Sequence, residues 1–183
     1  MYICICIYLY KYITNLYSYF DITDSPTFKG TKAQLSTNDY LPVDSTGIPL
    51  GKVEKYPRNV TDPFILDPAE PQFDNSFVME SDPTKIPVDT REQPLKLLAK
   101  FSNPDSKLNL EIHSTEPAFQ FYSGEFIDVP SVGGAPARGR CSAFAIEPSR
   151  FTNAVNEPAW RSMCLVSKGK LYGAKNVYKA WKE

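Results

Sequence analysis

The sequence predicts an all-β protein built as an antiparallel β-sandwich, and three observations support this prediction. Short apolar runs alternate with small or polar residues at a period of two, as where Phe144 and Ile146 project to one side of residues 140–151. Prolines divide residues 26–94 into pieces too short for a helix of ordinary length. An aromatic content of 13%, with 16 prolines against 9 glycines, is typical of strand-rich chains.

The predicted elements follow one another as short strands joined by turns. Residues 31–44 predict a strand that leads into an X-Pro turn, and residues 45–56 predict a second turn and strand. Residues 93–124 predict hairpins, because the Asn-Pro-Asp-Ser run at 103–106 has turn chemistry and lies between two apolar faces. On the first of these strands we expect one shared face, made by Leu95, Leu97, Ala99 and Phe101.

The last third of the chain continues this pattern with more irregular connections. Residues 131–140 are rich in glycine and proline and predict a flexible loop. Residues 156–162 predict one short helical turn. Residues 163–181 predict two strands around a Lys-Gly-Lys turn.

Composition excludes several classes of partner. The formal net charge is -1, so the chain predicts no basic face and no nucleic-acid partner. The apolar run before Lys11 is too short to span a bilayer, so we expect no membrane association. The four cysteines form no Cys-x-x-Cys pair and the single histidine, His113, has no neighbouring ligand, so no metal site is expected. Reduced thiols and a cytoplasmic location are the simplest interpretation.

Polar side chains opposite the apolar faces point to a sugar site. Gln120, Tyr122 and Glu147 all occupy such positions on their strands. A carboxylate, an amide and an aromatic ring match the hydroxyl array and the weakly apolar ring face of a sugar. The alternatives are a solvated strand end for Glu147 and an exposed strand amide for Gln120. We interpret His113 as a surface or cleft-rim imidazole, and Arg150 as paired with a neighbouring loop.

Five motifs follow one another along the chain: YLPVDSTGIPLG (40–51), PQFDNSFV (71–78), TEPAFQFYSG (115–124), FAIEPSRFTNAVN (144–156) and GKLYGAKNVYK (169–179). Together they resemble the C-terminal half of the aldose 1-epimerase family, whose members are also called galactose mutarotases. The EPSRF variant resembles the fungal branch, in which this domain is often fused behind a UDP-galactose 4-epimerase domain.

The resemblance implies a β-sandwich of the galactose mutarotase-like (supersandwich) type, which interconverts the anomers of a free hexose, galactose or glucose, without a cofactor. It implies that Glu147 is the general base on the C1 hydroxyl. Burial beside apolar neighbours should raise the pKa of this carboxyl towards neutrality, which suits a base. Asp74 and Gln120 match residues that bind sugar hydroxyls, although Asp74 also suits a turn.

Two departures from the family accompany these matches. The family's general-acid histidine lies in a Thr-Asn-His-Ser-Tyr-Phe stretch, and residues 14–20 read TNLYSYF here, with Tyr17 in the histidine's place. The resemblance covers residues 14–183, so we interpret residues 1–13 as an atypical N-terminal segment and the family's N-terminal half as absent. We therefore hold two hypotheses: a mutarotase weakened by these departures, and a truncated non-catalytic sugar-binding relative or pseudoenzyme. An incomplete sandwich also predicts exposed strand edges and self-association.

Overall fold

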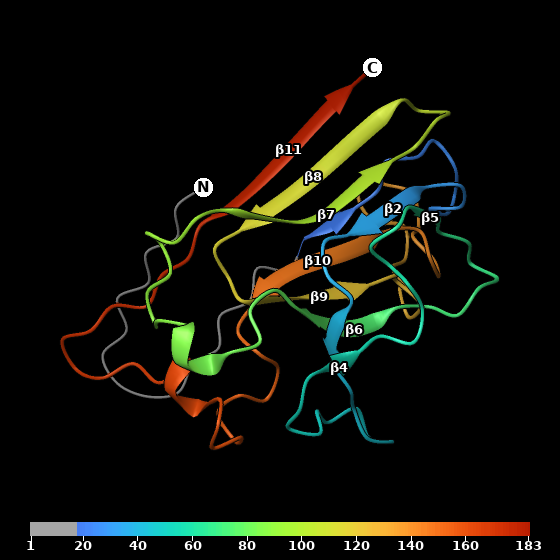
Figure 1. The fold of residues 1–183 in the computed structure, drawn as a ribbon. Coiled ribbons are helices and arrows are strands. Elements are labelled where there is room, and N and C mark those ends of the chain that lie inside the picture. Colours follow the sequence, from blue (N-terminus) through green and yellow to red (C-terminus); the bar gives the residue numbers. More distant parts are fainter. Residues whose placement is uncertain (1–17) are drawn as a thin grey trace.

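The structure is a computed structural model that describes residues 18–183, and within that range two antiparallel sheets pack face to face (Figure 1). Sheet A has six strands, in the order β1 (Tyr19–Phe20), β10 (Phe144–Ser149), β9 (Ala118–Tyr122), β6 (Asp74–Val78), β3 (Asp39–Leu41) and β4 (Glu54–Lys55). Sheet B has five, in the order β11 (Asn176–Lys182), β8 (Leu108–Ser114), β7 (Lys96–Ser102), β2 (Lys32–Leu35) and β5 (Phe64–Ile65). The predicted antiparallel β-sandwich is confirmed.

Helical structure among the described residues is limited to two 3-10 turns, η1 (Pro83–Lys85) and η2 (Arg161–Met163), and neither could cross a membrane. The helical turn expected at residues 156–162 therefore begins only near the end of that range. The expected pair of strands over residues 163–181 is wrong, because β11 is the only strand there. Met163 and Cys164 are instead buried against other parts of the chain, and this packing overrides the local pattern.

Residues 31–44 form two strands in different sheets where the sequence predicted one. The chain leaves sheet B after Leu35 and enters sheet A at Asp39. Asn38 holds this crossing, because its Nδ2 donates to the Tyr56 carbonyl at 2.9 Å and its Oδ1 accepts from the Val60 amide at 3.0 Å. The partners of Asn38 come from a distant part of the sequence, so the local pattern carried no sign of the crossing.

The face predicted for β7 is interrupted by an irregularity in its pairing with β8. The register shifts between Leu97 and Ala99, which leaves both Leu98 and Ala99 fully buried. Leu95, which the alternation placed on the buried face, is 45% exposed. A bulge adds one residue to a strand and so reverses the alternation on one side of it.

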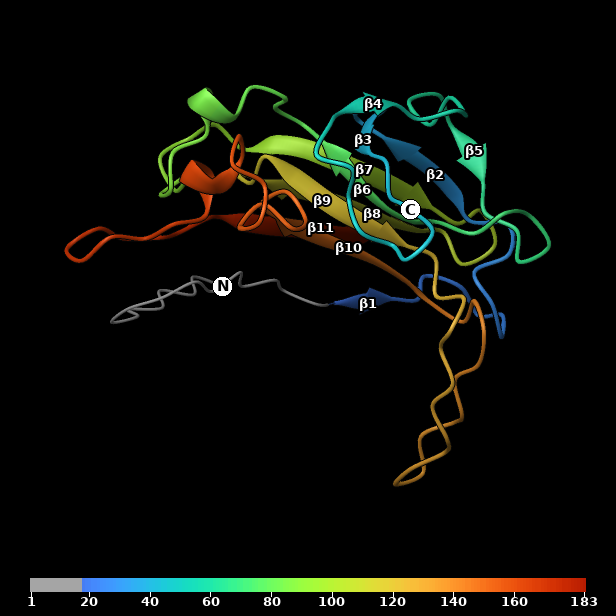
Figure 2. The same ribbon diagram turned by 90° about the horizontal axis from the view of Figure 1, so that it is seen from below.

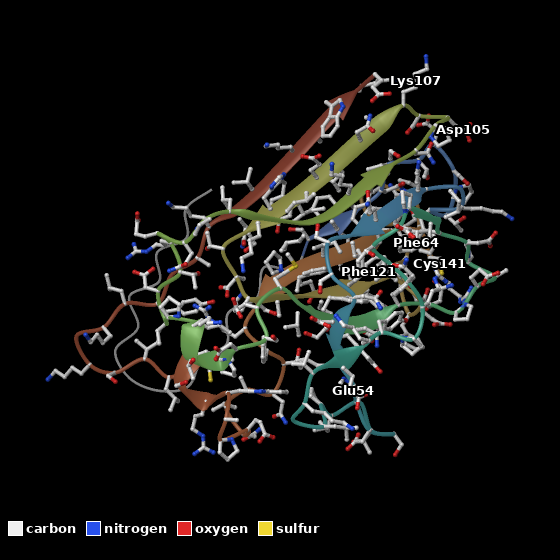
Figure 3. The ribbon with its side chains drawn as sticks, in the orientation of Figure 1. Glu54, Phe64, Asp105, Lys107, Phe121 and Cys141 are labelled. Carbon is white, nitrogen blue, oxygen red and sulfur yellow. The ribbon has the colours of Figure 1, made fainter. Side chains whose placement is uncertain are left out.

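Aromatic side chains fill the space between the sheets. Phe101 of sheet B stacks on Phe144 of sheet A with ring centroids 4.1 Å apart. Phe73 contacts both Phe121 and Phe64, with ring centroids 4.7 and 5.5 Å apart, and Figure 3 labels these two partners. Each buried phenyl ring contributes about 1.5–3 kcal/mol through removal of its apolar surface from water. The alternation of β9 is confirmed, since Phe119 and Phe121 lie in this core.

A second, smaller core lies on the opposite face of sheet A. It gathers side chains from the sheet and from the segments that carry η1 and η2: Leu41, Val78, Ile86, Ala118, Phe151, Ala154, Trp160, Met163 and Cys164. These segments cover one end of that face. The segment between β9 and β10 projects away from both sheets, as Figure 2 shows. The candidate site lies on this face of sheet A, in the rows between the second core and the projecting segment.

Candidate functional site

The register of sheet A brings the predicted site residues together. Glu147 of β10, Gln120 of β9 and Ser76 of β6 are paired in one row across three strands. The adjacent row on the same face holds Tyr122 and Asp74, which are paired with each other. Residues two positions apart on a strand share a face, so Glu147, Gln120 and Asp74 converge on one side of the sheet.

A hydrogen bond joins two of these side chains. Gln120 Nε2 donates to Asp74 Oδ1 at 2.6 Å. The bond orients the amide and leaves the other carboxylate oxygen of Asp74 and the carbonyl oxygen of Gln120 as acceptors for sugar hydroxyls. Tyr122 lies beside them and meets Tyr19 edge-on, with ring centroids 6.3 Å apart. The face therefore combines polar acceptors with an aromatic border.

Glu147 has the environment of a base. It is only 6% exposed, and its carboxylate accepts no hydrogen bond from any residue of the described range. Burial, and then the negative charge of Asp74, raise its pKa from 4.5 to about 7. A carboxyl group with such a pKa is half ionised near neutrality, where it can accept a proton and later release it.

Two hydroxyl groups near this site were not identified from the sequence. Ser76 Oγ is buried in the same row as Glu147 and has no hydrogen-bond partner among the described residues. The Tyr178 hydroxyl of β11 is also buried without one, and burial followed by the charge of Glu147 raises its pKa. Period-two alternation from Asp74 could have found Ser76. Nothing local could have found Tyr178, because it belongs to the other sheet and its relation to Glu147 is electrostatic.

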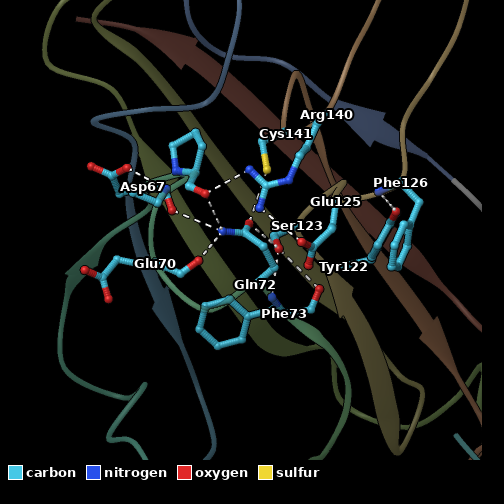
Figure 4. A network of polar contacts seen from close by, with 12 residues as sticks. Asp67, Glu70, Gln72, Phe73, Tyr122, Ser123, Glu125, Phe126, Arg140 and Cys141 are labelled. Atoms are coloured by element: carbon cyan, nitrogen blue, oxygen red, sulfur yellow. Dashed lines mark hydrogen bonds and ion pairs between the residues drawn. The ribbon is translucent and has the colours of Figure 1, made fainter.

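A polar network holds the strand ends that carry Asp74 and Tyr122 (Figure 4). Ser123 Oγ accepts from the Phe73 amide at 2.8 Å and donates to Gln72 Oε1 at 2.9 Å. The Ser123 amide in turn donates to the Phe73 carbonyl at 2.9 Å. These bonds tie the start of β6 to the end of β9 and so fix the position of Asp74 relative to Gln120.

A buried ion pair holds the end of β10. Arg150 lies 3.1 Å from Glu116 through Nη1, and its Nη2 donates to the Val88 carbonyl at 2.7 Å. The Tyr172 hydroxyl donates to the second Glu116 oxygen at 2.8 Å. Burial raises the pKa of Glu116, whereas the Arg150 guanidinium and the Tyr172 hydroxyl oppose that rise. The interpretation of Arg150 as paired with a neighbouring loop is confirmed.

The remaining predicted residues lie away from this face. His113 is on β8, where its Nε2 lies 3.1 Å from Glu111 Oε2 on the outward side of sheet B, as expected for a surface imidazole. Tyr17 lies outside the described residues, so its assignment stays a prediction. Residues 18–183 contain no group of three or more side chains suited to holding a metal ion.

Comparison with known proteins identifies relatives of this chain. The family model described as aldose 1-epimerase matches residues 15–179. The bifunctional protein GAL10 of Kluyveromyces lactis is 38% identical over 171 residues, which cover 91% of this chain and 24% of that protein. The aldose 1-epimerase of Escherichia coli is 26% identical over 165 residues, which cover 80% of this chain and 44% of that protein. The chain thus spans half or less of the curated relatives it matches.

A solved structure supports the fold alone. The GalM/aldose epimerase homologue from C. elegans superposes with a TM-score of 0.72 at 20% sequence identity. The match covers 93% of this chain and 52% of that one.

Proposed function

Because this chain belongs to the aldose 1-epimerase family, we propose that the face around Glu147 binds a free hexose, galactose or glucose, and takes part in interconverting its anomers. The observation that carries the proposal is the state of Glu147. Its carboxylate is buried and unpaired among the described residues, has a pKa of about 7, and stands one strand away from the Gln120–Asp74 pair.

The chemistry is a pair of proton transfers around one broken bond. Glu147 takes the proton of the C1 hydroxyl while the bond between C1 and the ring oxygen breaks and the ring oxygen receives a proton. The C1–C2 bond of the open chain rotates, and reversal of the steps closes the ring with the other configuration at C1. Asp74 and Gln120 hold the sugar hydroxyls during this rotation. No electron transfer occurs, so the proposed reaction needs no cofactor.

The proposed site departs from the family in the residue that would donate a proton to the ring oxygen. Tyr17 stands where the family carries histidine, and the unperturbed pKa of tyrosine is about 10 against about 6.5 for histidine. A phenol is therefore the poorer acid near neutrality, and loss of a positioned acid typically costs about 100- to 10,000-fold in rate. Tyr17→His should raise the rate without restoring that of an intact relative, because one residue is also inserted in this stretch.

The test is polarimetry of freshly dissolved α-D-galactose with the purified chain. A rate above that of buffer, abolished by Glu147→Gln, supports the proposal. The presence of Tyr17 in place of the family's histidine favours a second candidate function, that of a sugar-binding relative without catalytic activity. That candidate holds if both proteins match the buffer rate while calorimetry shows galactose binding. Absence of both turnover and binding overturns both candidates.

We also propose a cytoplasmic location and self-association through strand edges. Cys141 and Cys164 are free thiols in the structure, as a reducing compartment favours. Within the described residues, β11 is an edge strand of sheet B, and its unpaired backbone groups can pair with another chain. Light scattering that shows a monomer at all concentrations contradicts the second proposal.

A further inference from the structure

The outward face of sheet B carries an aromatic and polar arrangement that the Glu147 site does not use. Two cross-strand rows run over β11, β8, β7 and β2. One row holds Trp181, Asn109, Ser102 and Lys32. The next row on the same face holds Lys179, Glu111, Lys100 and Gln34. Since side chains alternate along each strand, the inward neighbours of these residues, such as Leu110 and Ile112, belong to the core.

A hollow of about 240 Å³ lies over these rows. Its polar and aromatic lining comes from both: Lys32, Gln34, Lys100, Ser102, Asn109, Glu111 and Trp181. Pockets for drug-sized molecules start at about 300 Å³, so this hollow has room for roughly one six-membered ring with its substituents.

Trp181 supplies an apolar wall to the hollow. Its side chain is 43% exposed, whereas the other tryptophan of the chain, Trp160, is 4% exposed in the second core. A large indole left open to water at a polar hollow can gain by covering its ring face. The hydrogen-bearing face of a pyranose ring is flat and weakly apolar, and it fits such a surface.

The hydrogen-bonding groups around the indole are partly preorganised. Gln34 Nε2 donates to the Thr61 carbonyl at 2.8 Å, which orients the amide and leaves its oxygen to accept. Glu111 is held by Lys100 at 3.3 Å and by His113 at 3.1 Å. Bonding to His113, followed by Lys100, lowers the pKa of Glu111, so it accepts as a carboxylate. The ammonium group of Lys32 makes no hydrogen bond or ion pair with any described residue and remains a donor.

The charge balance selects among ligands for this hollow. Among the residues that line the hollow, Glu111 pairs with Lys100, so Lys32 is the one lining cation without an ion pair to a described residue, which is little positive charge for a phosphate. Lys179 of the second row lies outside the lining. A neutral ligand with donors and acceptors can hydrogen-bond to Gln34, Glu111 and Lys32, and it brings no charge of its own that lacks a partner in the hollow. Sugar hydroxyls both donate and accept, and they match this set.

We propose that the outward face of sheet B holds a second, non-catalytic binding site for one neutral pyranose ring, which stacks on Trp181 and bonds to Gln34, Glu111 and Lys32. The ring can be free or part of a glycoside, because the hollow is open and no group in it acts on C1. The proposal stands apart from the function proposed for the Glu147 face, and either can fail alone.

The experiment titrates the full chain with methyl β-D-galactopyranoside and methyl β-D-glucopyranoside, whose locked C1 prevents turnover. We expect at least one of them to change the emission of the exposed Trp181, while the buried Trp160 gives a constant background. Trp181→Ala should weaken the affinity about tenfold or more in calorimetry. Phe126→Ala is the matched control, since Phe126 is 80% exposed on the projecting segment and its loss should change nothing.

A double variant separates the two sites. Asp74→Ala with Gln120→Ala removes the sugar contacts of sheet A and should leave the Trp181 signal unchanged. The proposal is overturned if neither glycoside alters the emission, or if binding survives Trp181→Ala and disappears in the double variant. An emission change that follows protein concentration but not sugar would show that Trp181 lies in an interface between copies, which also overturns it. If Trp181→Ala does not fold, Gln34→Ala and Glu111→Gln must weaken the emission titration instead.

Discussion

Two buried glutamates, Glu116 in the connection between β8 and β9 and Glu147 on β10 of sheet A, differ in their partners. Glu116 is 2% exposed and Glu147 is 6% exposed, and burial raises the pKa of both. Glu116 has Arg150 at 3.1 Å and a hydrogen bond from Tyr172. Among the described residues, the charged group that acts on the pKa of Glu147 is the negative Asp74, and no described residue donates a hydrogen bond to Glu147. The partners, rather than the burial, separate a carboxylate that holds the fold from one that is free to exchange a proton.

The largest difference between the two glutamates should appear in turnover. Glu147→Gln removes the proposed base and should lower any mutarotation rate by about 100- to 10,000-fold, as is typical for a positioned acid–base group. Glu116→Gln should leave the rate per folded molecule within a few-fold of wild type. Polarimetry on samples whose folded fraction is known from circular dichroism measures both. Equal losses of mutarotation rate in the two variants would contradict the assignment of a catalytic role to Glu147 and a structural role to Glu116.

The second largest difference should appear in stability. Arg150→Met leaves the Glu116 carboxylate buried without its cation and should lower the free energy of unfolding by about 3–5 kcal/mol. Combining Arg150→Met with Glu116→Gln removes the unpaired charge, so the double variant should be more stable than Arg150→Met alone. Urea unfolding of the three proteins gives these values. A double variant less stable than the single one would mean that hydrogen bonding, not the charge, dominates this cluster.

Glu147→Gln should have the opposite effect on stability. The folded-state pKa of Glu147 is raised, so the folded chain binds more protons than the unfolded one and Glu147 destabilises it as pH rises from 4.5 through about 7. A neutral glutamine removes this cost. At pH 8 the variant should be more stable by on the order of 1–3 kcal/mol, and at pH 4 the difference should vanish. Urea unfolding at the two pH values tests this, and a gain independent of pH would contradict the titration of Glu147.

The smallest expected effect concerns the charge of Asp74. The mutarotation rate should rise with pH around a midpoint near 7, because the base works in its ionised form. Asp74→Asn removes a negative neighbour and should move the midpoint down by roughly a few tenths of a pH unit, since burial is the larger cause. The pH–rate profile gives this midpoint independently of the lost sugar contact. An upward movement would show that Asp74 does not act through its charge.

Local sequence determined much of the sandwich and of the candidate face. Period-two alternation and the turn at residues 103–106 predict the pairing of β7 with β8, because these adjacent strands are joined by a short connection. Alternation alone predicts β9, which belongs to the other sheet. The same alternation put Gln120 and Glu147 opposite the apolar faces of their strands. The motif resemblance added Asp74 and the roles proposed for all three.

Tertiary structure alone decided where distant segments meet. The crossing at Asn38, the shifted register in β7 and the second core under η1 and η2 each depend on contacts between segments far apart in the chain. The same holds for the electrostatic interaction of Tyr178 with Glu147 and for the pairing of Arg150 with Glu116. Alternation reports only which way a side chain points from its own strand. Which groups surround it, and hence its pKa, depends on the strands and loops packed on that face, and these are brought there by burial of apolar surface across the whole domain.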